Sequence, residues 1–183
     1  MMSFISGQNI IGILGGGQLG KMLLSVTREW DIHTKVMDPN NQAPCKLSCN
    51  QFVQADLMDY DAVVNFGKDV DILTIEIENV NTDALHFLEN QGVKVYPQAS
   101  VLRIIQNKGY QKEFYLKNDI PTASFELFKS KESLKNAVAR GFVSFPFVLL
   151  FLKSEQQYDD SVCLALFIFS LMIFSLLGAY RLN

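Results

Sequence analysis

Apolar and polar residues follow two alternating periods from the start of the chain to about residue 100. Short β-branched runs predict strands at 9–14, 33–38, 51–56, 71–78 and 93–97. Between them, apolar residues at helical spacing predict helices at 18–30, 59–70 and 81–91. In the first helix the apolar positions are Leu19, Met22, Leu23 and Val26. This alternation predicts an α/β fold in which helices wrap a parallel sheet.

The pattern changes after Pro97. Two helices are predicted at 99–107 and 109–118, then a strand at 122–128, a helix at 130–140 and a strongly apolar run at 142–152. We therefore expect a Rossmann-like first domain over 1–100 and the incomplete start of an α+β domain over 101–150. A divergent apolar tail follows over 151–183, and its residues 161–180 include no charged side chain.

A glycine-rich loop separates the first predicted strand from the first predicted helix. Gly15, Gly17 and Gly20 fit the pattern G-x-G-x-x-G. Glycines permit a sharp turn and the close approach of a ligand, and the unpaired N–H groups at a helix start attract an anion, most often phosphate. The same residues also fit a tight turn that binds nothing, and the loop alone does not decide between the two interpretations.

Acidic residues are predicted at the carboxyl ends of two strands. Asp38 either bonds a ribose hydroxyl, as in dinucleotide-binding folds, or starts the turn at Pro39. Glu76 and Glu78 alternate along the strand predicted at 71–78, so both are expected on one face near its carboxyl end. Ligands gather at that edge of open α/β sheets. The two acids either bind an amine or a hydroxyl of a ligand there, or they are solvent-exposed residues of the strand edge without a ligand.

Composition narrows the functional classes. Sixteen Lys and Arg residues against 19 Asp and Glu residues give a net charge of −3, so there is no basic surface for nucleic acid. The three cysteines have no second pair and no nearby histidine, which argues against a zinc site or a disulfide framework. The N-terminal residues lack the features of a signal peptide. We therefore expect a cytoplasmic protein with reduced thiols.

Four segments together resemble the 5-(carboxyamino)imidazole ribonucleotide synthase family of the ATP-grasp superfamily. They are GILGGGQLGKML, DILTIEIENV, VYPQASVLRIIQNKGYQKEF and NDIPTASF, in the family's order between about residues 9 and 148. The resemblance implies a preATP-grasp domain followed by an ATP-grasp domain. It also implies an ATP-dependent ligase of purine biosynthesis that uses magnesium to join bicarbonate to aminoimidazole ribonucleotide through carboxyphosphate. Family members are commonly dimers, so a homodimer is an expectation.

The resemblance also implies roles for individual residues. The residues expected to face the ribonucleotide are Gly15, Gly17, Gln18, Leu19, Gly20, Glu76 and Glu78. Lys108 falls where the family carries a basic residue that contacts ATP. No catalytic residue and no metal ligand is expected in this chain, because the acids that hold magnesium belong to the later part of the family's ATP-grasp domain.

After residue 148 the chain departs from the family pattern. Leu150 stands near the position where the family has an ATP-binding lysine. Lys153 is a candidate for that role at a shifted position, and the glycine-rich loop that follows in the family is missing here. We therefore expect an inactive N-terminal fragment whose tail arises from a frameshift or a gene-model error. The alternatives are a module anchored in a membrane through residues 161–180, and an NAD(P)-binding oxidoreductase module that uses the glycine loop and Asp38.

The apolar run at 142–152 yields a prediction about solubility. Strands of this kind without their sheet partners promote aggregation. We expect the whole chain to be poorly soluble and a shorter chain that ends near Gln98 to be more soluble. Soluble yield after parallel expression measures the difference, and equal yields would contradict the expectation.

Overall fold

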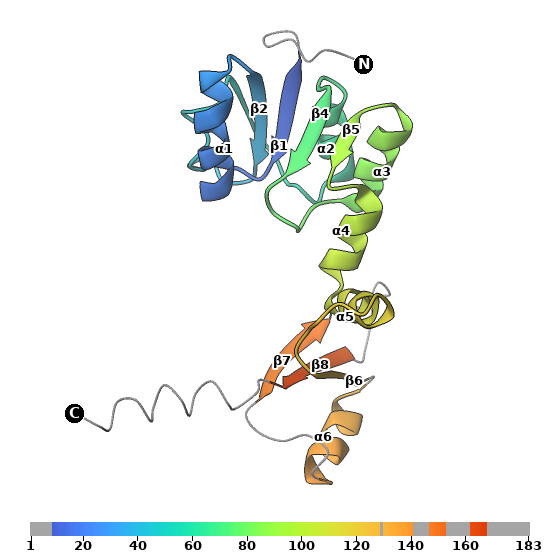
Figure 1. Cartoon of the computed structure of the whole chain (residues 1–183). Coiled ribbons are helices and arrows are strands. Elements are labelled where there is room, and N and C mark those ends of the chain that lie inside the picture. Colours follow the sequence, from blue (N-terminus) through green and yellow to red (C-terminus); the bar gives the residue numbers. More distant parts are fainter. Residues whose placement is uncertain (1–8, 129, 141–146, 153–161, 168–183) are drawn as a thin grey trace, which may run out of the picture. The chain divides into compact units, whose positions relative to one another are not determined.

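A computed structural model describes residues 9–128, 130–140, 147–152 and 162–167 (Figure 1). Its internal contacts divide the chain into two compact units, residues 1–106 and 107–183. The predicted alternation of strands and helices in an α/β fold is confirmed, and most element ends lie within a few residues of the predicted ones.

The first unit is built on a five-stranded sheet in which all neighbouring strands are parallel. Its strands are β1 (Ile10–Leu14), β2 (His33–Asp38), β3 (Gln51–Gln54), β4 (Ile72–Ile75) and β5 (Lys94–Tyr96). They lie in the order β3-β2-β1-β4-β5, so the central strand β1 pairs with both β2 and β4. The winding reverses beside β1, and such a switch point is where open α/β sheets bind ligands.

Four helices accompany this sheet: α1 (Gln18–Glu29), α2 (Tyr60–Gly67), α3 (Thr82–Asn90) and α4 (Ala99–Gln106). The predicted start of α3 is confirmed, because the Asn81 side chain accepts the N–H of Ala84 at 2.9 Å. Gly92 follows the helix with φ +93°, a conformation that glycine adopts without strain. Local capping signals thus set the limits of this helix.

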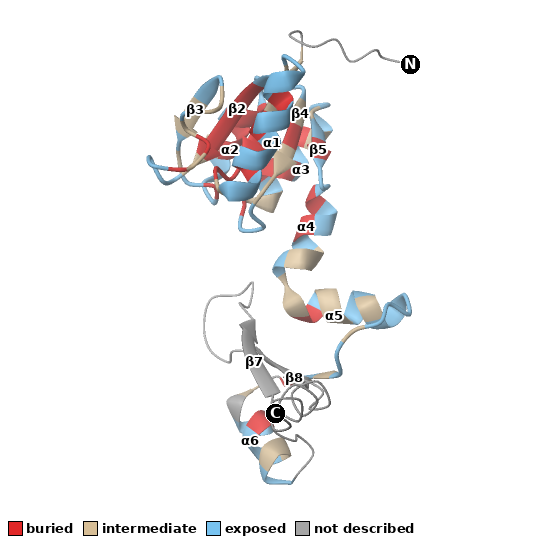
Figure 2. Ribbon diagram, turned by 60° about the vertical axis from the view of Figure 1, so that its left-hand side comes forward, coloured by how far each residue is buried: buried red, intermediate tan, exposed pale blue. Residues whose placement is uncertain are grey.

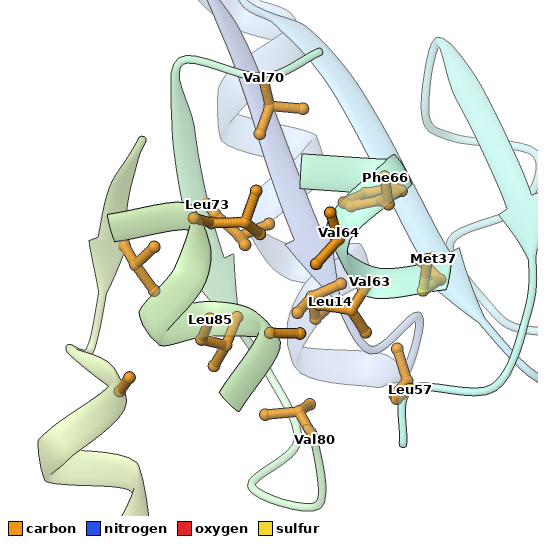
Figure 3. Packing of buried hydrophobic residues seen from close by; sticks show 14 of the residues in the cluster. Leu14, Met37, Leu57, Val63, Val64, Phe66, Val70, Leu73, Val80 and Leu85 are labelled. Atoms are coloured by element: carbon orange, nitrogen blue, oxygen red, sulfur yellow. The ribbon is translucent and has the colours of Figure 1, made fainter. Parts of the chain in front are cut away.

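Two apolar clusters fill the faces of the sheet. The larger one joins the sheet to α2, α3 and α4 (Figure 3) and includes Leu14, Met37, Val63, Phe66, Leu73, Val80, Leu85, Leu88, Ala99 and Leu102. The smaller one lies on the α1 side and consists of Ile13, Leu24, Val36 and Cys45, with partly buried neighbours. One face is therefore covered by several helices, whereas α1 covers the other (Figure 1).

Helix α1 packs through a different face from the one its apolar spacing suggests. Its buried residues are Gly20, Leu24 and Thr27. The four residues at helical spacing are exposed instead: Leu19 is 67% exposed, Met22 66%, Leu23 40% and Val26 48%. Figure 2 shows much of α1 in the colour of exposed residues. Because Gly20 has no side chain, the backbone of α1 approaches the loop after β1 closely at this face.

A buried lysine side chain, that of Lys35, lies at the C-terminal end of α2. The Lys35 side chain is only 7% exposed, and its Nζ donates to the carbonyl of Phe66 at 3.2 Å and pairs with Asp69 at 3.3 Å. The Nζ also lies 4.8 Å from the centre of the Phe66 ring. A cation at the C-terminal end of a helix is favourable because the last carbonyls carry partial negative charge.

The second unit contains α5 (Lys108–Lys117), β6 (Phe125–Phe128), α6 (Lys131–Ala139), β7 (Phe147–Leu152) and β8 (Val162–Phe167). Its strands form an antiparallel sheet in the order β6-β8-β7, so the expectation that the apolar run at 142–152 lacks sheet partners is wrong for β7, which pairs with β8. A membrane helix over 161–180 is therefore wrong for residues 162–167, which form a central strand. In the described part of the chain, no helix has the length and apolar character that a bilayer span requires. Lys153 and residues 168–183 lie outside the described residues.

The core contacts of α4 give a prediction about the shortest stable form of the first unit. Ala99 and Leu102 are 1% and 2% exposed, and the Ala99 N–H donates to Glu89 at 2.9 Å. A chain that ends at Gln98 loses these contacts, whereas one that ends at Gln106 keeps them. We expect the shorter chain to lose about 3 kcal/mol of unfolding free energy. Urea unfolding of both chains measures this difference, and equal midpoints would refute it.

Candidate functional site

The loop after β1 makes its sharp turn at Gly15. Gly15 has φ +102°, a left-handed conformation that L side chains rarely adopt. Its N–H donates to the carbonyl of Met37 at 2.9 Å, so the loop remains attached to β2 as it leaves the sheet. Helix α1 begins three residues later, with Gly17 as its N-cap. The predicted arrangement of strand, glycine loop and helix is confirmed.

Glu76 lies directly against this loop. Its N–H donates to the carbonyl of Leu14 at 2.8 Å, which joins the end of β4 to the end of β1. A Cβ atom added to Gly15 would lie 2.6 Å from Oε2 of Glu76, and one added to Gly17 would lie 2.7 Å from Oε1. The space at these two glycines is therefore taken by the Glu76 carboxylate of the same chain.

Asp38 holds the loop from the side of β2. Its Oδ2 accepts the N–H of Gly16 and its Oδ1 accepts the N–H of Asn40, both at 2.7 Å. Both carboxylate oxygens are thus bonded to the backbone of this chain. This arrangement favours the turn-forming interpretation of Asp38 over the ribose-binding one, and it weakens the argument for an NAD(P) module.

The turn that contains Cys45 packs against the glycine loop. The N–H of Cys45 donates to the carbonyl of Gly16 at 3.1 Å, and its Sγ lies 3.5 Å from the carbonyl oxygen of Gly17. Burial, followed by the charges of Cys49 and Glu76, raises the pKa of Cys45 to about 11. The Cys45 sulfur is therefore a protonated thiol at neutral pH, able to donate a weak hydrogen bond.

Two features of this region are open to a ligand. The first helical bond of α1 runs from the Lys21 N–H to the carbonyl of Gly17 at 3.0 Å, so the amides before it precede the helical ladder. Beside them is a cavity of about 210 Å³. It is lined by Ile13, Leu19, Gly20, Leu23, Thr74, Ile75 and Glu76. Glu76 is common to the loop and the cavity, so a ligand in the cavity would meet its carboxylate.

The structure brings most of the predicted site residues together. Gly15, Gly17, Gln18, Leu19 and Gly20 form one continuous loop and helix start, against which Glu76 lies. The expectation that Glu76 and Glu78 share a strand face is wrong, because β4 ends at Ile75 and both acids follow it. Glu78 is exposed, and Lys108 is the first residue of α5 in the second unit.

Two residues near the site have no signal in the sequence. Cys45 follows a proline in an irregular stretch, and nothing in its neighbourhood predicts contact with the glycines. The Gln106 side chain donates to the carbonyls of Glu78 at 2.7 Å and Val80 at 2.8 Å, which orders the segment after β4.

Across the residues that the structure describes, no three His, Cys, Asp or Glu side chains cluster as metal ligands would.

Comparison with known proteins places this site in a family. Residues 8–106 match the family described as the ribonucleotide synthetase preATP-grasp domain. The chain belongs to this family. The match covers the first unit almost completely and includes the glycine loop, Asp38, Cys45 and Glu76.

Curated relatives extend the similarity beyond the preATP-grasp domain. A phosphoribosylaminoimidazole carboxylase from Ogataea methanolica is 34% identical over 143 residues, which cover 76% of this chain and 26% of that protein. An N5-carboxyaminoimidazole ribonucleotide synthase from Bacillus subtilis is 35% identical over 130 residues, which cover 70% of this chain and 34% of that protein. The chain thus spans about a quarter to a third of the length of these relatives.

Solved structures agree with this relationship. An N5-carboxyaminoimidazole ribonucleotide synthetase from Thermotoga maritima is 31% identical, with a TM-score of 0.71 over 88% of this chain and 46% of its own. An N5-carboxyaminoimidazole synthase from Aspergillus clavatus, solved with ADP and 5-aminoimidazole ribonucleotide, is 27% identical. Its TM-score is 0.72 over 89% of this chain and 47% of its own.

The raised pKa of Cys45 predicts a pH dependence of stability. The folded state keeps this thiol protonated up to pH about 11, whereas the unfolded chain releases the proton near its ordinary value of 9.0. The contribution is therefore fully present below pH 9 and lost as pH rises to 11. We expect a loss of about 2 kcal/mol of unfolding free energy over this range. Urea unfolding at several pH values measures it.

Alkaline pH affects other parts of the protein as well, so a variant that lacks the Cys45 thiol is needed as reference. Cys45→Ala lacks the thiol, and its stability should fall less steeply from pH 9 to pH 11 than that of the wild type. Parallel slopes for the two proteins would show that Cys45 does not cause the loss.

Proposed function

We propose that this chain binds aminoimidazole ribonucleotide at the carboxyl edge of its parallel sheet, as the substrate-binding part of an ATP-dependent carboxylation in purine biosynthesis. The observation that carries the proposal is the contact of the Glu76 carboxylate with the glycine loop, beside the open amides of α1 and a cavity. The family supports it, and so does the A. clavatus relative, which was solved with 5-aminoimidazole ribonucleotide.

The site offers both kinds of hydrogen-bonding partner that this substrate needs. The carboxylate of Glu76 accepts from an amine or a ribose hydroxyl, and the N–H groups of Gln18 and Leu19 donate to an oxygen. The cavity of about 210 Å³ beside Glu76 is lined mainly by apolar side chains, which suits the faces of a small heteroaromatic ring. A substrate that spans both parts would be fixed in position and orientation.

Charge determines which end of the substrate meets the loop. The carboxylates of Glu76 and Asp38 both touch the glycines, so a doubly charged phosphate in the same place would meet two like charges. A ribose hydroxyl can donate to Glu76 and accept from an amide. We therefore place the ribose and the amine against the loop, which differs from the sequence-based expectation of a phosphate there.

The reaction of the intact family uses ATP and bicarbonate. Phosphoryl transfer from ATP to bicarbonate gives carboxyphosphate and ADP. The substrate amine then attacks the carboxyl carbon, and phosphate leaves while the amine loses a proton. In this scheme Glu76 orients the amine, and Lys108 contacts ATP. Magnesium would be held by the ATP phosphates and by acids of the later part of the ATP-grasp domain. We also propose that the chain forms a homodimer, as the family resemblance implies.

Substitution of Glu76 tests the proposal. Glu76→Gln keeps the size of the side chain but removes its charge, so it weakens the bonds to the substrate's donors. We expect the affinity for aminoimidazole ribonucleotide, measured by calorimetry, to fall about tenfold. The matched control is Glu29→Gln, because Glu29 is exposed and lies at the opposite end of α1 from the glycine loop. This control should bind within about twofold of the wild type.

Two further ligands separate the parts of the proposal. The aminoimidazole riboside, which lacks phosphate, should show the same loss with Glu76→Gln. Inorganic phosphate, which has neither the ribose nor the amine, should bind no more weakly to this variant than to the wild type. Absence of binding to the wild-type chain would refute the proposed substrate, and binding of NADH instead would support an oxidoreductase module.

A further inference from the structure

The peptide groups on both sides of Gly16 are held by the protein. The N–H of Gly16 donates to Oδ2 of Asp38 at 2.7 Å, and its carbonyl accepts the N–H of Cys45 at 3.1 Å. A Cβ atom at Gly16 would lie 2.9 Å from Cβ of Ala43, so the turn packs tightly on the loop. The loop therefore has little freedom to rotate at this residue.

The next carbonyl is held both by α1 and by the turn that contains Cys45. The Gly17 oxygen accepts the first helical bond from Lys21 at 3.0 Å, and Sγ of Cys45 lies 3.5 Å from it. Sγ also lies 3.0 Å from the Cβ position of Gly20, so the sulfur fills the space between the loop and the first turn of α1. A larger side chain at Cys45 would have to displace Gly20.

These contacts determine where the following amides point. In a planar trans peptide the N–H lies opposite the C=O of the same peptide group. The N–H of Gly17 shares its peptide group with the Gly16 carbonyl, and the N–H of Gln18 shares its group with the Gly17 carbonyl. Because Cys45 binds both carbonyls, both N–H groups point away from the turn that contains Cys45.

We propose that Cys45, together with Asp38, is a positioning residue that fixes the peptide groups of Gly16 and Gly17 and so aims the amides of Gly17 and Gln18 at the substrate. This assignment rests on the proposed function, in which the amide of Gln18 donates to an oxygen of the ribonucleotide, and it adds the amide of Gly17 to that contact. Cys45 itself touches neither the substrate nor the reacting atoms. Its backbone bond sets the position of the loop, and its thiol adds the second contact.

Three variants of the full chain test this role. Cys45→Ala removes the thiol bond and the packing at Gly20, and we expect about a fivefold loss of affinity for aminoimidazole ribonucleotide in calorimetry. Cys45→Ser restores a hydroxyl donor and should bind within about twofold of the wild type. Cys49→Ala, which changes a neighbouring thiol that makes no bond to the loop glycines, should bind like the wild type.

The comparison of serine with alanine separates positioning from stability. A buried serine in place of cysteine stabilises the fold no better than alanine does, so a purely structural role would not restore binding in Cys45→Ser. Wild-type affinity in Cys45→Ala, or equal weakness of the serine and alanine variants, would overturn the proposal.

A measurement without ligand keeps this inference independent of the proposed substrate. Amide order parameters from ¹⁵N relaxation should fall at Gly16, Gly17 and Gln18 in Cys45→Ala and recover in Cys45→Ser. Unchanged values in Cys45→Ala would refute the positioning role even if the ribonucleotide binds. If wild type and Cys49→Ala both fail to bind, the proposed substrate is wrong, and the relaxation data alone decide the role of Cys45.

Discussion

The hydrogen bond from the Glu76 N–H to the Leu14 carbonyl is the contact on which the site depends. It continues the parallel pairing of β1 and β4 by one step beyond the register pair Leu14 and Ile75. The strands β1 and β4 therefore end side by side, which brings the Glu76 side chain against the glycines of the loop. Without this pairing, the acid and the loop would be distant parts of the sequence with no reason to meet.

At each glycine of the loop, other residues of this chain occupy the space that a side chain would need. Glu76 fills the space at Gly15 and Gly17, Ala43 and Asp38 fill it at Gly16, and Cys45 fills it at Gly20. The consequence is a loop packed on all sides except that of its open amides. Such packing restricts the backbone in advance, and a restricted backbone loses less entropy when it binds.

Sequence reasoning succeeds here where the signal is local. The limits of α3, the glycine loop and the alternation of strands and helices all follow from short-range rules. It fails where the cause lies far along the chain. The exposed apolar stripe of α1 arises because Gly20 allows a different face to approach the loop, and contacts with distant residues bring Cys45 and Gln106 to the site. Periodicity carries no information about such contacts.

The close approach of Glu76 to the loop also constrains how this sequence can change over time. A side chain at Gly17 would collide with the Glu76 carboxylate, whereas a shorter residue at position 76 would make room for it. The effects of substitutions at the two positions are therefore not additive, since each depends on what occupies the other. Which substitution is tolerated at one position therefore depends on the residue at the other.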